Sequence, residues 1–211
     1  LTGEFRSFPA DHFIFMATAL GTVKKTALDE FSNPRKAGII AVDLDPGDQL
    51  VGAALTDGKH DVMLFSDAGK AVRFDEDDVR AMGRTARGVR GMMLEPGQNV
   101  IAMLVAEQDE TQNVVLGTAR MSVLCATENG YGKRTRVGDY PAKGRGTMGV
   151  KTVQLVESKG RLAGARIVRD GYQVMLISDG GTVIRMSVDD IKRSGRATQG
   201  VIVMRLREGE T

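Results

Sequence analysis

The sequence predicts an all-β fold of repeated, propeller-like units, and three observations support it. The chain repeats itself about every 50 residues, glycines recur at fixed offsets in each repeat, and short apolar runs flank them. The aligned segments are "FIFMATALGTVKKT" from Phe13, "VMLFSDAGKAVRF" from Val62, "VLCATENGYGKRT" from Val123 and "VMLISDGGTVIRM" from Val174. Their anchor glycines are Gly21, Gly69, Gly130 and Gly181.

Each repeat reads as about four short strands, the size of one propeller blade. An apolar run before the anchor glycine and another directly after it predict a β-hairpin. A second glycine, followed by Val or Ile, opens a third run, and a third glycine closes the unit. The second glycines are Gly38, Gly88, Gly149 and Gly200, and the third are Gly47, Gly97, Gly160 and Gly209.

The connections complete this organisation. Polar segments such as "DEDDVRAM" and "SVDDIKRS" leave room for about one helical turn after the second strand. We expect a connector at residues 1–12 and blades at 13–60, 61–121, 122–171 and 172–211, with "EQDETQN" as a spacer. The chain begins without an initiator methionine, which suggests a piece of a longer protein.

The string "GRGTMG" at residues 144–149 fits a dinucleotide-binding pattern but is a feature of the repeat. The matching strings "GRTARGV" and "GRATQGV" lack the middle glycine, and a strand follows where a nucleotide site needs a helix. We therefore expect no nucleotide site and no cofactor in this chain.

Composition excludes several other classes. No run of 18 apolar residues and no leader are present, so we expect no membrane contact and a cytoplasmic location. The single cysteine, Cys125, lies in the apolar run "SVLCAT" and reads as a buried structural thiol. His12 and His60 lie far apart, without cysteine or carboxylate at metal-ligand spacing, so we expect no metal site.

Charge is unevenly distributed along the chain although the net charge is only +2. The intervals 21–38, 69–91, 130–151 and 181–200 hold 20 of the 29 Lys and Arg residues but only 9 of the 27 Asp and Glu residues. They carry +11, and the remaining 128 residues carry −9. Such a separation predicts one basic rim that attracts a polyanion.

Two basic positions recur in the repeat. The residue four after the anchor glycine is Lys25, Arg73, Arg134 or Arg185, which we expect on the polar side of the turns, and a second arginine precedes the second glycine. The pattern predicts a curved track that binds duplex DNA by its phosphates, without base reading, because no recognition helix is evident and aromatic residues are sparse. The candidate DNA-binding residues are Lys24, Lys25, Arg35, Lys36, Lys70, Arg73, Arg84, Arg87, Arg90, Lys133, Arg134, Arg136, Lys143, Arg145, Arg185, Arg193 and Arg196.

Long stretches resemble one family. "FMATALGTVKKTALDEF", "VMLFSDAGKAVRFDEDDVRAMGRTARGVRG", "ATENGYGKRTRVGDYP" and "GRATQGVIVMRL" are similar to the C-terminal domain of the A subunit of bacterial DNA gyrase, from about Phe13 to Leu206. The resemblance implies a six-bladed β-pinwheel, a propeller-like disc whose blades exchange strands and whose basic rim wraps DNA. It also implies a bacterial, nucleoid-associated location. The implied protein partners are the ATPase subunit, together with the rest of the A subunit.

Two departures limit the resemblance. Four blades are visible, matching the last four of the family domain, and the basic glycine-rich box of the first family blade is absent. This piece is thus expected to bind DNA yet fail to support directional supercoiling. Catalysis, including the use of ATP and magnesium, belongs to other parts of the topoisomerase, and Tyr131, Tyr140 and Tyr172 are not nucleophile candidates.

Three alternatives remain open on sequence alone. The related DNA-binding subunit of topoisomerase IV carries a degenerate pinwheel without the full box. A propeller that binds protein partners would show exposed aromatic anchors in place of recurring arginines. A propeller hydrolase would need His, Asp or Glu residues converging on the central channel.

Overall fold

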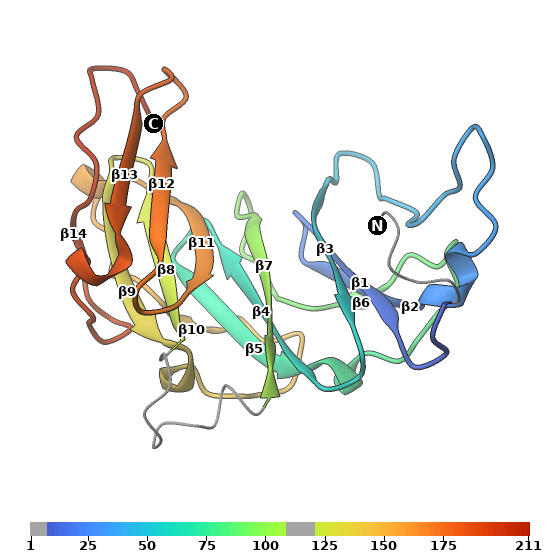
Figure 1. Ribbon diagram of the computed structural model, residues 1–211. Coiled ribbons are helices and arrows are strands. Elements are labelled where there is room, and N and C mark those ends of the chain that lie inside the picture. The colour runs from blue at the N-terminus through green and yellow to red at the C-terminus, as the bar shows by residue number, and fades with distance from the viewer. Residues whose placement is uncertain (1–7, 109–120) are drawn as a thin grey trace.

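The computed structural model describes residues 8–108 and 121–211, which form β-hairpin units placed along an arc (Figure 1). The expected connector lies partly outside these residues, and so does most of the spacer. The strands are β1 (Phe13–Thr18), β2 (Thr22–Ala27), β3 (Leu50–Thr56), β4 (His60–Ser66), β5 (Lys70–Asp75), β6 (Val89–Arg90), β7 (Val100–Glu107), β8 (Ser122–Thr127), β9 (Tyr131–Arg136), β10 (Val150–Lys151), β11 (Leu162–Val168), β12 (Gln173–Ile177), β13 (Val183–Ser187) and β14 (Val201–Ile202). The 3-10 helices are η1 (Leu28–Phe31), η2 (Glu76–Asp78), η3 (Val137–Asp139), η4 (Glu157–Lys159) and η5 (Val188–Asp190).

The anchor glycine closes a hairpin in every unit, as the repeat predicts. In the first unit Ala17 pairs with Val23 across the turn, and Gly21 adopts a φ of +87°. The Ser or Thr three positions before the anchor accepts a hydrogen bond from the residue just after it, as from Thr22 N–H to Thr18 Oγ1 at 3.2 Å. The same bond recurs at Ser66, Thr127 and Ser178.

Neighbouring units exchange strands. The sheets run in the order β3-β1-β2-β6, β10-β5-β4-β7 and β11-β8-β9-β14, with antiparallel pairing throughout. In each, one outermost strand comes from the next unit along the chain: β6 follows Gly88, β10 follows Gly149 and β14 follows Gly200. This exchange is the defining feature of the pinwheel fold that the resemblance implies.

The first and last units depart from the four-strand expectation. The described residues place no strand directly after Gly38, because they include no earlier hairpin for such a strand to join, and Ile40 is 64% exposed. The last hairpin, β12–β13, forms a two-stranded sheet, and Ile177 is 65% exposed. A hairpin therefore gains its outermost strand only where a following unit is described.

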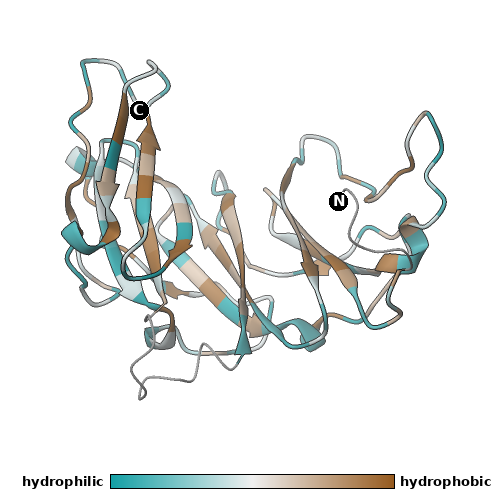
Figure 2. Ribbon diagram, viewed as in Figure 1, coloured by the Kyte–Doolittle hydropathy of each residue, from teal (hydrophilic) through white to brown (hydrophobic). Residues whose placement is uncertain are grey.

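The apolar core lies between successive sheets rather than in one centre. One cluster joins the first two units around Phe15 and Phe74, and another joins the second and third around Phe65 and Tyr140. Figure 2 shows hydrophobic residues concentrated in the strands and hydrophilic residues in the turns and 3-10 helices. Since β7 contacts both β3 and β11, these strands form the inner side of the arc, and the loops before β6, β10 and β14 lie at its outer edge.

Candidate nucleic-acid interface

Three of the four cations placed four residues after the anchor glycine are buried, which corrects the expectation that they lie on the polar side of turns. Lys25, Arg73 and Arg134 are 4%, 9% and 7% exposed. Each lies in the second strand of its hairpin and reaches the 3-10 segment of the next unit. Buried cations of this kind serve the fold, because their charges are already compensated within the protein.

Arg73 shows the arrangement most completely. Its Nε donates a hydrogen bond to Asp61 Oδ2 at 2.7 Å, and its second terminal nitrogen lies 2.6 Å from the same oxygen. The remaining terminal nitrogen donates to two carbonyls of the third unit, that of Val137 in η3 at 3.4 Å and that of Tyr140 directly after η3 at 2.9 Å. One guanidinium thus ties two neighbouring units together.

Lys25 and Arg134 repeat this role at the other junctions. Lys25 Nζ lies 2.8 Å from Asp77 Oδ1 in η2. Arg134 donates from Nε to the Ile191 carbonyl at 2.5 Å and pairs with Asp170 Oδ1 at 2.8 Å. The sequence could not reveal these junctions, since each joins residues far apart in the chain.

Arg185, the fourth of the cations that lie four residues after an anchor glycine, is exposed as expected. It belongs to β13, whose unit has no following unit among the described residues, and its Nε donates to Gln173 Oε1 within the same hairpin. Its exposure agrees with the role assigned to the other three, because burial of this position requires a next unit.

The lysines three positions after the anchor are also buried. Lys24 Nζ donates to the carbonyls of Ala41, at 2.8 Å, and of Arg84. Lys133 Nζ donates to the carbonyl of Gly195 at 2.7 Å. Burial disfavours the charged amine and so lowers the pKa of Lys24, and it lowers the pKa of Lys133 to about 8.

The arginines before the second glycine connect successive loops. Each donates from Nη1 to the carbonyl that lies two positions after the second glycine of the preceding unit. These bonds run from Arg84 to Ile40 at 2.9 Å, from Arg145 to Arg90 at 3.1 Å and from Arg196 to Lys151 at 3.1 Å. The loops at the outer edge are therefore held side by side in the order of the repeats.

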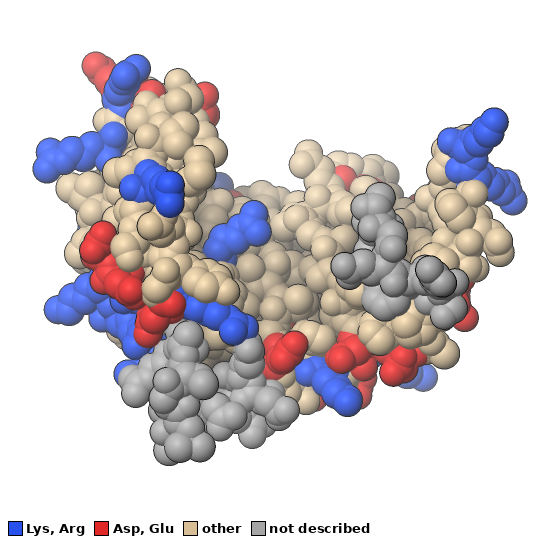
Figure 3. All heavy atoms as spheres, in the orientation of Figure 1, with Lys and Arg blue, Asp and Glu red and all other residues tan. Residues whose placement is uncertain are grey.

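Exposed cations remain on these loops. Within residues 8–108 and 121–211, Arg35, Lys36, Arg90, Lys143 and Arg145 are exposed and form no ion pair with a carboxylate. Figure 3 shows basic side chains over the end of the arc that carries β12–β14 and on the projecting loop that follows η1, with others in the middle and along the lower edge, where acidic side chains lie among them. Charges that no carboxylate compensates are the ones available to an external anion.

The other candidates differ in how far they are compensated. Arg87 is exposed but lies 3.4 Å from Asp43 Oδ2 and 3.1 Å from Asp45 Oδ1. Lys70 lies 3.9 Å from a Glu95 oxygen. Arg193 pairs with Asp170, and Arg136 is half-buried.

Two exposed lysines, Lys151 in β10 and Lys192 in the loop before β14, are absent from the sequence-based candidates. Both fall in or at the end of the intervals that carry the positive excess, so the charge count contained the signal that would have found them.

Cys125 and Tyr140 both belong to the apolar core. Cys125 is 2% exposed, as the apolar run predicts, and burial raises the pKa of its thiol. Tyr140 is 1% exposed, and desolvation raises the pKa of its hydroxyl. No helix of the described part of the chain is both long and apolar enough to cross a bilayer.

One cluster of possible metal ligands does not show in the sequence pattern. Donor atoms of Asp57, His60 and Glu76 all lie within 4.8 Å of one another. Asp57 is three positions before His60, but Glu76 follows 16 positions later, so strand pairing rather than local spacing brings it there.

Comparison with known proteins identifies a family. The family model described as "DNA gyrase C-terminal domain, beta-propeller" matches residues 12–57, 60–107, 122–169 and 172–211. The A subunit of DNA gyrase from Klebsiella oxytoca is 53% identical over 197 residues, which cover 93% of this chain and 21% of that protein. The chain thus spans about a fifth of the length of the relatives it matches.

Solved structures share the fold. The C-terminal domain of a DNA topoisomerase IV superposes with a TM-score of 0.84 at 25% identity, over 95% of this chain and 60% of that one. A DNA gyrase A C-terminal domain superposes with a TM-score of 0.81 at 24% identity, over 97% of this chain and 65% of that one. The two solved structures are about equally similar to this chain in sequence, so they show the shared fold, and the family assignment rests on the family model and the gyrase A sequence above.

Proposed function

Since the chain belongs to the DNA gyrase C-terminal domain family, we propose that it binds duplex DNA by its phosphates and bends the duplex along its outer edge. The observation that carries the proposal is the row of loops before β6, β10 and β14, held together by arginine-to-carbonyl hydrogen bonds. These loops and the short strands that follow them bear exposed cations without carboxylate partners, such as Lys143 in a loop and Arg90 in β6.

The buried cations and the exposed cations have different roles in this proposal. Lys24, Lys25, Arg73, Lys133 and Arg134 hold the units in a fixed curve. The exposed loop cations contact phosphates, which lie at about one charge per 1.7 Å of duplex axis. A rigid curved track is what bending requires, because phosphate contacts along the bend must offset a deformation cost of several kcal/mol.

The contacts proposed here carry no base specificity. Backbone phosphates are the same at every step, so affinity should depend on salt and on DNA flexibility rather than on a fixed sequence. In the whole protein this chain would act with the ATPase subunit, together with the remainder of the A subunit. Strand cleavage and ATP hydrolysis would take place in those other parts.

A topology assay tests whether the bent duplex is wrapped around the chain with one handedness. Relaxed closed-circular plasmid is incubated with increasing amounts of the chain and a nicking-closing topoisomerase, and the topoisomers are resolved on a gel after deproteinisation. We expect the mean linking number to shift in one direction in proportion to bound protein. An unchanged distribution at protein concentrations that saturate the plasmid would contradict wrapping while leaving simple binding intact.

A further inference from the structure

One buried slot of the repeat holds a carboxylate where the other units hold an aliphatic side chain. The first residue of the 3-10 helix after each hairpin is buried: Leu28 in η1, Val137 in η3 and Val188 in η5, but Glu76 in η2. Glu76 is fully buried, and its Oε2 has no hydrogen-bond partner. Burying an ionised carboxylate is costly unless a cation compensates it. The nearby Lys25 Nζ lies 3.7 Å from Oε2 but closer to Asp77, at 2.8 Å, so Glu76 shares that cation with a second carboxylate.

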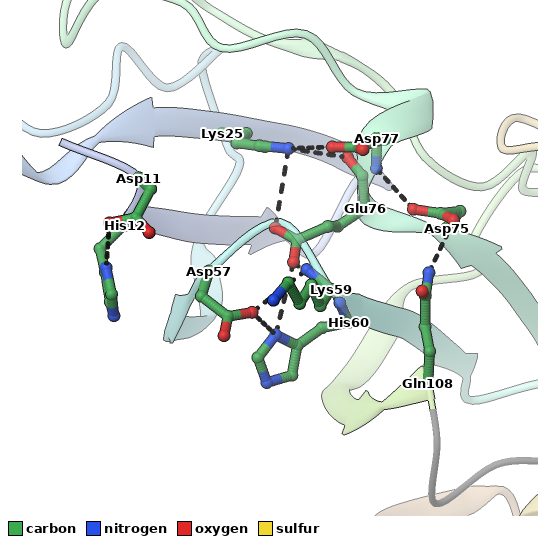
Figure 4. Close-up of polar contacts among 10 residues, drawn as sticks. All are labelled: Asp11, His12, Lys25, Asp57, Lys59, His60, Asp75, Glu76, Asp77 and Gln108. Carbon is green, nitrogen blue, oxygen red and sulfur yellow. Dashed lines mark hydrogen bonds and ion pairs between the residues drawn. The ribbon is translucent and has the colours of Figure 1, made fainter. Parts of the chain in front are cut away.

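His60 and Asp57 lie beside this carboxylate (Figure 4). His60 Nδ1 lies 3.4 Å from Glu76 Oε1 and 3.0 Å from Asp57 Oδ1. Glu76 Oε1 also accepts a hydrogen bond from the His60 backbone N–H at 2.9 Å, which fixes the carboxylate and leaves it a further lone pair. One imidazole nitrogen and two carboxylate oxygens therefore face a common point.

A hydrogen bond from the imidazole does not account for this arrangement. His60 Nδ1 is buried and, despite these short distances, is not aligned to form a hydrogen bond with either carboxylate. His12 occupies the equivalent position in the first unit, nine residues before its anchor glycine, and does hydrogen-bond its own neighbour Asp11 at 3.0 Å. Pro9 and Leu28 stand there in place of Asp57 and Glu76, so the first unit is a natural reference that lacks the carboxylates at both positions.

The side chains around the cluster carry a net negative charge that a bound cation would compensate. Lys25 Nζ lies 3.7 Å from Glu76 Oε2, on the other side of the carboxylate, and 2.8 Å from Asp77. With Lys25 counted, the three surrounding carboxylates of Asp57, Glu76 and Asp77 leave a formal charge of −2 when His60 is neutral. A divalent ion would neutralise the group.

We propose that Asp57 Oδ1, His60 Nδ1 and Glu76 Oε1 form a binding site for a divalent transition-metal ion of the zinc type. Donors about 2.0–2.1 Å from a tetrahedral zinc ion lie about 3.3 Å from one another, and the two measured separations of 3.0 and 3.4 Å bracket that value. The imidazole favours zinc over magnesium or calcium, which prefer oxygen ligands alone. Asp57 is 40% exposed in its side chain, which gives the ion a route in and leaves the fourth position to solvent.

The test is direct metal binding to the whole chain after removal of bound ions with a chelator. Zinc is titrated by calorimetry, and cobalt is used as a spectroscopic probe, because four-coordinate cobalt absorbs far more strongly in the visible than the six-coordinate aqueous ion. We expect one zinc ion per chain with micromolar or tighter affinity, a tetrahedral cobalt spectrum, and a rise in Tm on saturation.

Single-ligand variants locate the ion. Glu76→Gln and His60→Gln should each weaken zinc binding at least about tenfold and abolish the cobalt spectrum, whereas His12→Gln, the matched control, should leave both unchanged. Asp57→Asn, at a half-exposed turn, provides a third variant if the buried Glu76→Gln is poorly folded. The proposal is overturned if the parent binds no stoichiometric zinc, or if His60→Gln and Asp57→Asn bind it as the parent does.

Discussion

Replacing Arg73 with methionine should strongly destabilise the fold without changing its topology. The substitution keeps much of the apolar stem and removes the guanidinium that joins the second and third units. It leaves the Asp61 carboxylate, 5% exposed, without its cation, and it leaves the carbonyl of Tyr140 without its donor.

The size of the effect follows from these contacts. Removing one partner of a buried ion pair costs about 3–5 kcal/mol, because the remaining charge stays desolvated and uncompensated. Two guanidinium nitrogens contact the same carboxylate, at 2.6 and 2.7 Å, and both side chains are less than a tenth exposed. We therefore expect a loss of about 3–5 kcal/mol in the free energy of unfolding.

Urea unfolding followed by circular dichroism measures this loss, with Arg35→Met as the control for removal of an exposed cation. The control should change the free energy of unfolding by less than about 0.5 kcal/mol. The double variant Arg73→Met/Asp61→Leu should recover part of the loss, since no lone charge then remains buried. A loss below about 1 kcal/mol for Arg73→Met would refute the assignment of this side chain to the fold.

Two further predictions concern the junctions between units. Gly130→Ala should lower the free energy of unfolding by more than about 3 kcal/mol, because φ is +78° and an added Cβ would lie 2.1 Å from the Met204 carbonyl oxygen. Gly181→Ala, at φ +83° with open space around it, should lower it by only about 1–2 kcal/mol. Equal losses for the two variants in thermal or urea unfolding would argue against close packing at the junction. Desolvation lowers the pKa of Lys133 to about 8 in the folded chain, below its usual value of 10.5, so the unfolded chain binds more protons between these values. The free energy of unfolding of the parent should therefore rise relative to Lys133→Met as pH rises from about 8 to about 10.5, and a difference that is flat across this range would contradict a desolvated amine.

The hairpins and their turns could be predicted because the signals are local. An anchor glycine at positive φ, a Ser or Thr three residues before it and apolar runs on both sides all act within a dozen residues. The excess of positive charge in the intervals around these turns could also be counted from the sequence, and exposed cations such as Arg35 and Lys143 were among the predicted site residues.

The burial of Arg73 could not be predicted, since it depends on tertiary contacts. The Tyr140 carbonyl that it reaches lies 67 positions away. A regularly spaced basic residue is compatible with a phosphate-binding track and equally with a repeated junction between units. The missing strand after Gly38 has a similar cause, because strand exchange depends on the neighbouring unit and not on the segment itself.

The central claim is that exposed loop cations bind the phosphates. The loop variant changes one exposed cation per unit to glutamine, and the control variant removes four exposed cations elsewhere, so both lose the same charge. The loop variant carries Arg35→Gln, Arg90→Gln, Lys143→Gln and Lys192→Gln, and the control carries Lys59→Gln, Arg166→Gln, Arg205→Gln and Arg207→Gln.

The decisive measurement is the affinity for a duplex of fixed length as a function of salt, taken for the parent and both variants. Each phosphate contact contributes about 0.9 to the slope of log affinity against log salt, so the loop variant should lose about 3.6 of the parent's slope. The control variant should keep the slope of the parent. A loop variant with the parent's slope, or a control variant that loses as much, would contradict the claim.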